Sequence, residues 1–428
     1  EAIAKDVAYD THVSSKVHNQ GPHSTCYIHS SICSLLTTLL GVDFFNAHDE
    51  ITPRVMVAPQ RYIQGPGVLN QIDRYVSLLN VKRVGILASQ RGQGAEGQRI
   101  SERLNNDNID CIPAVFDGEC SLKEVEKHVR ALAGENLDCL IAVGGGKPVD
   151  AGKSIAYRLD IPVVIVPTLA SNDAPTSALS VLYTTEGAND TVEFYPSNPA
   201  MVIVDTEVIA AAGERYFVAG IGDAMATWFE ARVCFKNTSA ITPIGARPTL
   251  ASYAIGEVCA QTLFEKGEAA SRAVVAGTCT DAFESVVEAN TLLSGIGFES
   301  GGLALAHPVA LAFTQIDEIH QKYLHGEMVA MGTLIQLTLE RSVDAEKVAR
   351  FFANIGLPIH MTQLSLSPKD SAAISAIIEA TLGNRNAHHM PMPVTYDSLR
   401  EAMLDANKLG MAVAAEVGDA AYRRLHTD

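Results

Sequence analysis

Three side chains in the second half of the chain could together bind a divalent cation. They are Asp223, His307 and His325, and each stands beside a glycine or a proline. Zinc, iron and other divalent transition metals all accept a carboxylate and two imidazoles as ligands. A single buried histidine, however, is more often an ordinary hydrogen-bonded residue. The three residues therefore form a metal-site hypothesis that depends on how the chain folds.

The two histidines set a condition on the fold. They are 18 residues apart, and on one continuous helix that separation would rise about 27 Å. Both ligand atoms must lie about 2 Å from one ion. If His307 and His325 share a metal, the chain must therefore fold back between them. Residues 317–325 show no obvious helical stripe and Gly326 supplies a break, so we expect the reversal there.

A glycine-rich loop in the first half could bind a phosphate group. Gly144, Gly145, Gly146 and Lys147 follow a short apolar run, and Pro148 comes next. Glycines let the backbone approach an anion closely, and proline suits the first turn of a helix. The N-terminus of that helix favours negative charge, and the lysine adds a cation. The pattern predicts a phosphate site, and a tight turn without a ligand is the alternative.

A second glycine pattern competes for the same role. Gly92, Gly94 and Gly97 form a GxGxxG motif after a predicted strand, and Asp117 stands 20 residues after Gly97. This arrangement is typical of a dinucleotide-binding fold. Three residues separate the strand from the first glycine, which weakens the match. We therefore take the loop at 144–148 as the main phosphate site and keep this motif as the alternative.

The elements that must position these groups are first strands and helices in alternation. Short apolar runs bounded by turn signals indicate a parallel sheet that is covered on both faces. The predicted strands are Arg83–Ala88, Cys111–Phe116, Leu137–Val143 and Ile161–Val166, the predicted helices include Gln98–Leu104 and Leu122–Ala133, and the runs Val181–Thr185 and Thr191–Phe194 predict a hairpin.

Strand signals stop after about residue 214. The helices predicted beyond it are Ala224–Val233, Tyr253–Phe264, Thr280–Leu293, Glu327–Glu340 and Ala373–Ala380. We predict an α/β domain with a parallel, Rossmann-like sheet at 53–212, which binds the nucleotide. An all-α domain at 213–428 follows it and binds metal and substrate. Residues 1–52 form a predicted N-terminal extension with one short helix at Ile32–Leu40.

The composition excludes several classes of protein. The chain has 428 residues, of which 47% are hydrophobic, and this supports a packed core rather than disorder. Its formal net charge of −17 argues against binding to nucleic acid or to an anionic membrane surface. The eight cysteines form no CxxC pair, which is typical of reduced thiols in an intracellular protein. The cytoplasm and the mitochondrial matrix both stay open.

Five stretches of sequence match one family. They are GGGKPVDAGK at 144–153, PTLASNDAPTSALSVLYT at 167–184, GIGDAMATWFEA at 220–231, GLALAHPVA at 302–310 and HGEMVAMG at 325–332. From about residue 54 to the C-terminus, the chain resembles glycerol dehydrogenases of the iron-containing alcohol dehydrogenase superfamily. The resemblance implies a dehydroquinate synthase-like fold and a homo-oligomer, with an octamer as the expected form.

The resemblance also implies roles for individual residues. The loop at 144–148 is expected to bind the pyrophosphate of NAD, and Asp173 is expected to lie near the substrate as the candidate catalytic residue. Asp223, His307 and His325 are expected to hold one Zn²⁺ per subunit. The residues implied on the nicotinamide side are Thr168, Ser171, Ser177, Leu179 and Tyr183.

Two positions distinguish this chain from parts of the superfamily. Iron-dependent members have a metal-binding histidine four residues after the aspartate, where this chain has Thr227. That difference favours the zinc-dependent branch. Many relatives also carry an aspartate that binds the adenosine ribose, at the position of Ser89, and Arg91 stands close to it here. A missing carboxylate beside a cation is what the 2′-phosphate of NADP prefers, so NADP competes with the expected NAD.

The activity implied is the oxidation of glycerol, or of a related vicinal diol, at C2. The products would be dihydroxyacetone and NADH. Residues 171–179 contain no lysine or arginine, which favours an uncharged polyol over a sugar phosphate or the acidic substrate of a lyase-type relative. The remaining alternatives are another metal-dependent polyol or alcohol dehydrogenase and a non-catalytic nucleotide sensor.

Overall fold

The computed structural model describes residues 52–426. The predicted extension at 1–52, with its helix at Ile32–Leu40, lies outside the described residues except for its last position. Within the described range, strands occur up to Asp205 and helices follow. The domain boundaries at 52/53 and 212/213 stay predictions.

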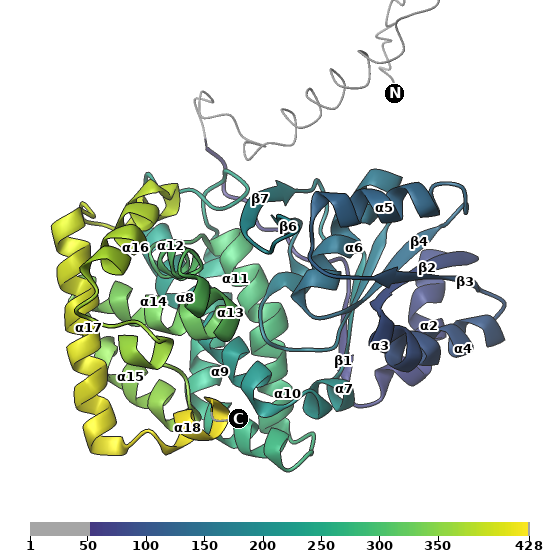
Figure 1. The fold of residues 1–428 in the computed structure, drawn as a ribbon. Coiled ribbons are helices and arrows are strands. Elements are labelled where there is room, and N and C mark those ends of the chain that lie inside the picture. The colour runs from purple at the N-terminus through teal and green to yellow at the C-terminus, as the bar shows by residue number, and fades with distance from the viewer. Residues whose placement is uncertain (1–51, 427–428) are drawn as a thin grey trace, which may run out of the picture. The chain divides into compact units, whose positions relative to one another are not determined.

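Six parallel strands form the sheet, in the order β1-β8-β5-β4-β2-β3 (Figure 1). The strands are β1 (Tyr62–Gly65), β2 (Arg83–Ser89), β3 (Asp110–Phe116), β4 (Cys139–Gly144), β5 (Val163–Pro167) and β8 (Met201–Asp205). The four predicted strands are confirmed, each to within two residues at either end. We did not predict β1 and β8, although all five residues of β8 are buried, as expected for an inner strand of a parallel sheet.

Helices cover both faces of the sheet, as the sequence predicts (Figure 1). They are α2 (Ile72–Val76), α4 (Gln98–Asn106), α5 (Leu122–Leu132) and α6 (Gly146–Leu159). Alternate residues of β2 face opposite ways, so Ile86 packs with α2 and α4 while Leu87 packs with α5 and α6. The predicted hairpin is confirmed as β6 (Leu179–Tyr183) paired with β7 (Asn189–Phe194), and it is attached to α6 by Ser180, whose hydroxyl donates to the carbonyl of Asp150.

The rest of the described chain is helical. Its helices are α7 (Thr206–Ala211), α8 (Glu214–Lys236), α9 (Leu250–Val275), α10 (Asp281–Glu288), α11 (Ser294–Gly301), α12 (Ala306–Phe313), α13 (Asp317–Lys322), α14 (His325–Leu339), α15 (Asp344–Ile355), α16 (Ser371–Gly383), α17 (Tyr396–Val417) and α18 (Ala420–His426). The predicted helices are present. The stretch 317–325, which shows no obvious helical stripe in the sequence, contains α13, whose six residues are too few to show an apolar stripe.

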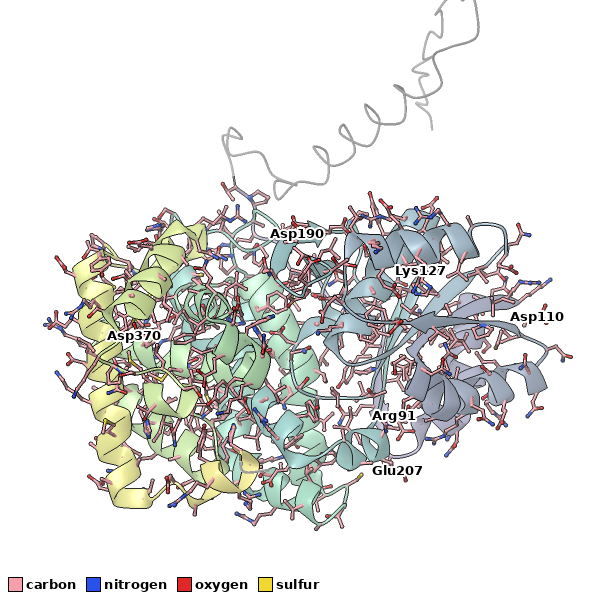
Figure 2. The ribbon with its side chains drawn as sticks, viewed as in Figure 1. Arg91, Asp110, Lys127, Asp190, Glu207 and Asp370 are labelled. Atoms are coloured by element: carbon pink, nitrogen blue, oxygen red, sulfur yellow. The ribbon has the colours of Figure 1, made fainter. Side chains whose placement is uncertain are left out.

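No single described helix is long and apolar enough to cross a membrane. One pair of helical segments, Asp281–Gly301 and Ala306–Phe313, would be long and apolar enough together, but it is bent by 106°. The charged side chains labelled in Figure 2 are all exposed: Arg91, Asp110, Lys127, Asp190, Glu207 and Asp370. Buried charges are fewer, and several of them, including Asp150, Lys153, Asp173 and Asp223, lie in or beside the site described next.

Candidate metal and cofactor site

Three helices bring the predicted metal ligands together. Asp223 lies in α8, His307 in the first turn of α12, and His325 begins α14. One ligand atom from each residue lies within 4.8 Å of the other two. The chain does fold back between the two histidines, through α13, so the condition set by their spacing is met.

The spacing of these atoms suits a bound cation. Oδ1 of Asp223 is buried and has no hydrogen-bond partner among residues 52–426. Nε2 of His307 lies 3.3 Å from it, and Nε2 of His325 lies 3.4 Å from it. Two ligands of a tetrahedral ion, each at about 2.1 Å, are roughly 3.4 Å apart. A divalent cation between the three atoms would supply the partner that this buried oxygen lacks.

A fourth residue, Glu230, fixes the ring of His307. Nδ1 of His307 donates to Oε2 of Glu230, and Oε1 of Glu230 accepts from the backbone N–H groups of His307 and Ala304, at 3.1 and 2.9 Å. With its proton on Nδ1, a neutral imidazole presents the lone pair of Nε2 toward Asp223. A carboxylate behind a ligand histidine is the usual arrangement around a protein-bound metal.

Asp173 lies directly beside this cluster. Its backbone N–H donates to Oδ2 of Asp223 at 3.2 Å, and its own Oδ2 accepts from the Ser294 hydroxyl at 2.9 Å. Burial and the nearby charge of Asp223 raise the pKa of Asp173 well above its ordinary value. Burial also acts to raise the pKa of Asp223, but His325 and His307 lower it more, so it stays below its usual range. Of the two adjacent carboxyl groups, Asp223 therefore loses its proton at a lower pH than Asp173.

Glycines let the ligand-bearing helices approach closely. A Cβ at Gly222 of α8 would lie 2.4 Å from the carbonyl oxygen of Gly326, and a Cβ at Gly326 of α14 would lie 1.8 Å from that of Ala219. Neither distance is possible for a real side chain. Both glycines stand next to a ligand, Asp223 or His325, so this close helix contact sets the separation of the two ligands.

The predicted phosphate loop joins a strand to a helix. Strand β4 ends at Gly144 and α6 begins at Gly146, so the N–H groups of the first turn of α6 lie at the carboxyl edge of the sheet. Lys147 stands in that first turn, where its ammonium forms an ion pair with Glu119 at 2.6 Å. The loop has the backbone arrangement of an anion site at a helix N-terminus.

One short segment connects this loop to the metal ligands. A Cβ at Gly145 would lie 2.9 Å from the Leu169 side chain, and a Cβ at Gly146 would lie 2.9 Å from Nδ2 of Asn172. The next residue, Asp173, is bonded to Asp223. Residues 169–173 therefore contact the phosphate loop at one end and the metal cluster at the other, which places the two predicted sites side by side.

The comparisons with known proteins agree with this geometry. A family model of iron-containing alcohol dehydrogenases matches residues 59–206. The glycerol dehydrogenase of Escherichia coli is 41% identical over 368 residues, which are 85% of this chain and 99% of that protein. The chain belongs to the iron-containing alcohol dehydrogenase family. It is therefore an oxidoreductase.

Two further relatives support the assignment. The glycerol dehydrogenase of Citrobacter freundii is 40% identical over 360 residues, which are 83% of this chain and 98% of that protein. The crystal structure of glycerol dehydrogenase from Schizosaccharomyces pombe superposes with a TM-score of 0.82 at 34% identity, and the match covers 86% of this chain and 94% of that one. The predicted fold class is confirmed for this member of the family.

The residues implied on the nicotinamide side lie on the segments after β5. Thr168 donates its backbone N–H to the carbonyl of Gly144 at 2.9 Å. Ser171 is half-buried between Thr168 and Asp173. Ser177 is fully buried, and its hydroxyl accepts from Lys153 and donates to Ala174. The remaining two, Leu179 and Tyr183, are the first and last residues of β6. Their contact with a cofactor stays a prediction.

The competing GxGxxG motif has a different structure from that expected. Gly92 ends the short helix α3 (Gln90–Gly92), and Gly97 ends the π-helical segment η3 (Gln93–Gly97), which continues into α4. Gln93 between them donates to the carbonyls of Ile86 and Ala114. These glycines lie within helical turns rather than in an open strand–helix loop, which favours the loop at 144–148 as the phosphate site.

Several residues beside the site were not found from the sequence. Glu230 left a usable signal, because it stands seven residues, or two helical turns, after Asp223 and therefore on the same face of α8. Ser294 and Glu299 left none, since they lie in α11, beyond the end of the helix predicted at Thr280–Leu293. Lys153 lies within the matched stretch 144–153, but its buried pair with Asp150 at 2.8 Å appears only in the structure.

Proposed function

We propose that this chain is a metal- and NAD-dependent glycerol dehydrogenase that oxidises C2 of glycerol and yields dihydroxyacetone. One observation carries the proposal: residues 169–173 join a phosphate loop to a carboxylate–diimidazole cluster. The relatives from Citrobacter freundii and Escherichia coli, at 40% and 41% identity, are glycerol dehydrogenases, which supports the same substrate.

Asp223, His307 and His325 would hold the metal, which we propose is zinc. A divalent cation at this place would act as a Lewis acid and favour loss of the hydroxyl proton. The three protein ligands leave positions open for a substrate. Glu230 keeps His307 in the required tautomer, and the buried Asp223 contributes negative charge beside both imidazoles.

The charges of the site favour an uncharged substrate. Asp173 lies beside Asp223 and would accept a hydrogen bond from a hydroxyl of the polyol. The nearest lysines are already engaged, because Lys153 is buried against Asp150 and Lys147 is paired with Glu119. A phosphorylated or acidic substrate would meet carboxylates without a free lysine to balance its charge.

NAD, when bound, would supply the acceptor for the hydride from C2. The first turn of α6 would face its pyrophosphate. Ser89 ends β2, and its hydroxyl accepts from the backbone N–H of Gly92. No carboxylate stands at this strand end, and Arg91 is exposed in the next turn (Figure 2). NAD remains our proposal, and these two residues make the comparison with NADP part of the test.

The experiment combines metal analysis with activity. The protein is stripped with a chelator, reloaded with zinc or with iron, and assayed for glycerol oxidation with NAD and with NADP. Asp223→Asn and His325→Ala should lose both metal and activity, while His388→Ala, which changes an exposed histidine bonded to the carbonyl of Leu382, should keep both.

Each outcome has a definite meaning. One zinc per chain with NAD-dependent activity would support the proposal as stated. Higher kcat/KM with NADP would overturn the choice of cofactor alone, and activity restored only by iron would overturn the choice of metal. Nucleotide binding without metal uptake or glycerol oxidation would leave a nucleotide sensor. A homo-oligomer stays a prediction that native mass spectrometry of the same sample tests.

A further inference from the structure

A threonine occupies the place next to the metal ligand on α8. Thr227 stands four residues after Asp223, so both side chains are on one face of the helix. Thr227 is fully buried, and its hydroxyl lies 2.9 Å from the hydroxyl of Ser294 on α11, which is also fully buried. A buried hydroxyl pair therefore stands one helical turn from the candidate ligand Asp223.

The two hydroxyls form a chain with one direction. Ser294 donates its single proton to Oδ2 of Asp173 at 2.9 Å. Its oxygen must therefore accept from Thr227, because each hydroxyl carries one proton. The order is Thr227 to Ser294 to Asp173, and every proton points toward the carboxylate. Among the described residues the chain ends at the buried Thr227, so it orients a group rather than carrying protons to solvent.

The packing of α11 is adapted to this contact. A Cβ at Gly295 would lie 1.8 Å from Oγ1 of Thr176, and a Cβ at Gly297 would lie 2.3 Å from Cγ2 of Thr227. Only glycine at these two positions lets α11 approach closely enough for Ser294 to reach both partners. Larger residues would push the helix away and open the hydrogen bonds.

The helix is also interrupted just before Ser294. The π-helical segment η5 (Ala289–Leu293) separates α10 from α11. A π turn contains one extra residue and therefore rotates the following side chains relative to a continuous α-helix. Within this segment, Asn290 donates to the carbonyls of Ala170 and Phe217 at 3.0 and 3.1 Å, which fixes it against α8 and the loop that leads to Asp173.

We propose that Thr227 and Ser294 are positioning residues that hold the Asp173 carboxylate in the orientation needed to bind a substrate hydroxyl. The proposal rests on the proposed function. Ser294 holds Oδ2 of Asp173. This bond fixes the plane of the carboxyl group, so that Oδ1 keeps one orientation toward the substrate hydroxyl.

The test uses five single variants and one double variant of the metal-loaded enzyme. Ser294→Ala removes the donor, Thr227→Val removes the second hydroxyl at constant shape, and Thr227→Ser restores it. Asp173→Asn defines the effect of losing the carboxylate. Ser300→Ala is the matched control, because Ser300 is a fully buried serine on the same helix whose hydroxyl bonds only the backbone of Val57 among the described residues.

We expect Ser294→Ala to lower kcat for glycerol about ten-fold, as for loss of one hydrogen bond that orients a group in contact with the substrate. Thr227→Val should cause a smaller fall that Thr227→Ser reverses. Metal content and the KM for NAD should not change, and Ser300→Ala should lower the melting temperature without lowering kcat. Adding Ser294→Ala to Asp173→Asn should cause little further loss, because the serine acts through the aspartate.

Three results would overturn the inference. The first is normal kcat in Ser294→Ala while Asp173→Asn is impaired. The second is a full additional loss in the double variant, since this would show independent action. The third is loss of metal in step with activity, which would make the contact a support of the metal site. Failure of the proposed function is distinct, because the unchanged metal-loaded chain would then oxidise no glycerol.

Discussion

The imidazole of His307 lies between two carboxylates, one at each ring nitrogen. Glu230 accepts from Nδ1, and Asp223 lies 3.3 Å from Nε2. Burial acts to lower the pKa of His307, but these two acids raise it well above its ordinary value. A cation therefore has to replace a proton on this ring, and the carboxylate behind it keeps the ring correctly turned.

Glu230→Gln should weaken metal binding without removing any ligand. We expect the metal dissociation constant to rise about 10- to 100-fold, because the charge that orients His307 is lost. Competition with a fluorescent chelator measures this constant. Glu124→Gln is the control, since Glu124 and His128 form a similar buried pair in α5, at 2.9 Å, that belongs to no such cluster. Unchanged metal affinity in Glu230→Gln would show that the packing around His307 orients the ring without the carboxylate.

Helices α8 and α14 form the part of the fold on which the separation of the ligands depends. They cross where Gly222 faces Gly326, and Asp223 and His325 stand beside these glycines. A helix interior normally disfavours glycine by roughly 0.5–1 kcal/mol relative to alanine. Here glycine is required despite that cost, because α8 and α14 lie too close together for a residue with a Cβ atom.

Gly326→Ala and Gly222→Ala should each destabilise the fold and reduce metal content. The added methyl has to push the helices apart, at a cost of about 1–3 kcal/mol, and this moves His325 away from Asp223. Gly256→Ala on α9 is the matched control, because its Cβ would meet Trp228 at an ordinary 3.6 Å, and it should leave the melting temperature unchanged or raised. Melting temperature and elemental analysis decide the matter. Normal metal content in Gly326→Ala would show that α8 and α14 can move apart without separating His325 from Asp223.

At the scale of the whole molecule, a buried acid joins the helical part to the strand-containing part. Glu299 of α11 accepts from the backbone N–H of Ala178 at 2.8 Å and from Nδ2 of Asn198 at 2.6 Å. Burial raises the pKa of Glu299 to about 7, although these hydrogen bonds lower it. The folded chain therefore keeps this proton at pH values where an unfolded chain, with a pKa of about 4.5 for glutamate, has lost it.

This difference makes stability depend on pH in a definite direction. The stabilising contribution is fully present below pH 4.5 and is lost as pH rises toward 7, for a total on the order of 3 kcal/mol. Glu299→Gln does not titrate, so the variant should gain stability relative to the original chain between about pH 5 and 7.5. Urea unfolding across this range measures the difference. Two parallel curves would contradict the assignment, because a constant offset between them would reflect only the altered bond to Asn198.

The sequence by itself determined the strands β2 to β5 and the hairpin, and it predicted the candidate phosphate loop and the candidate metal ligands. Each of these depends on neighbouring residues: short continuous apolar runs bounded by turns, glycines before a helix, or a short matching stretch such as GIGDAMATWFEA. The short strand β1 has no buried residue to mark it, and β8 is a single apolar run that a sequence alone does not separate from a buried helix turn.

Only the tertiary structure decided how distant groups meet. Glu230 and His307 are 77 residues apart, and Ser294 and Asp173 are 121 apart. Their contacts depend on where α8, α11 and α12 cross and on a π turn before α11. They also depend on glycines that leave room for a neighbouring segment to pack closely. Such contacts leave no local period in the sequence, because the energy that selects them comes from packing between segments rather than from preferences within one.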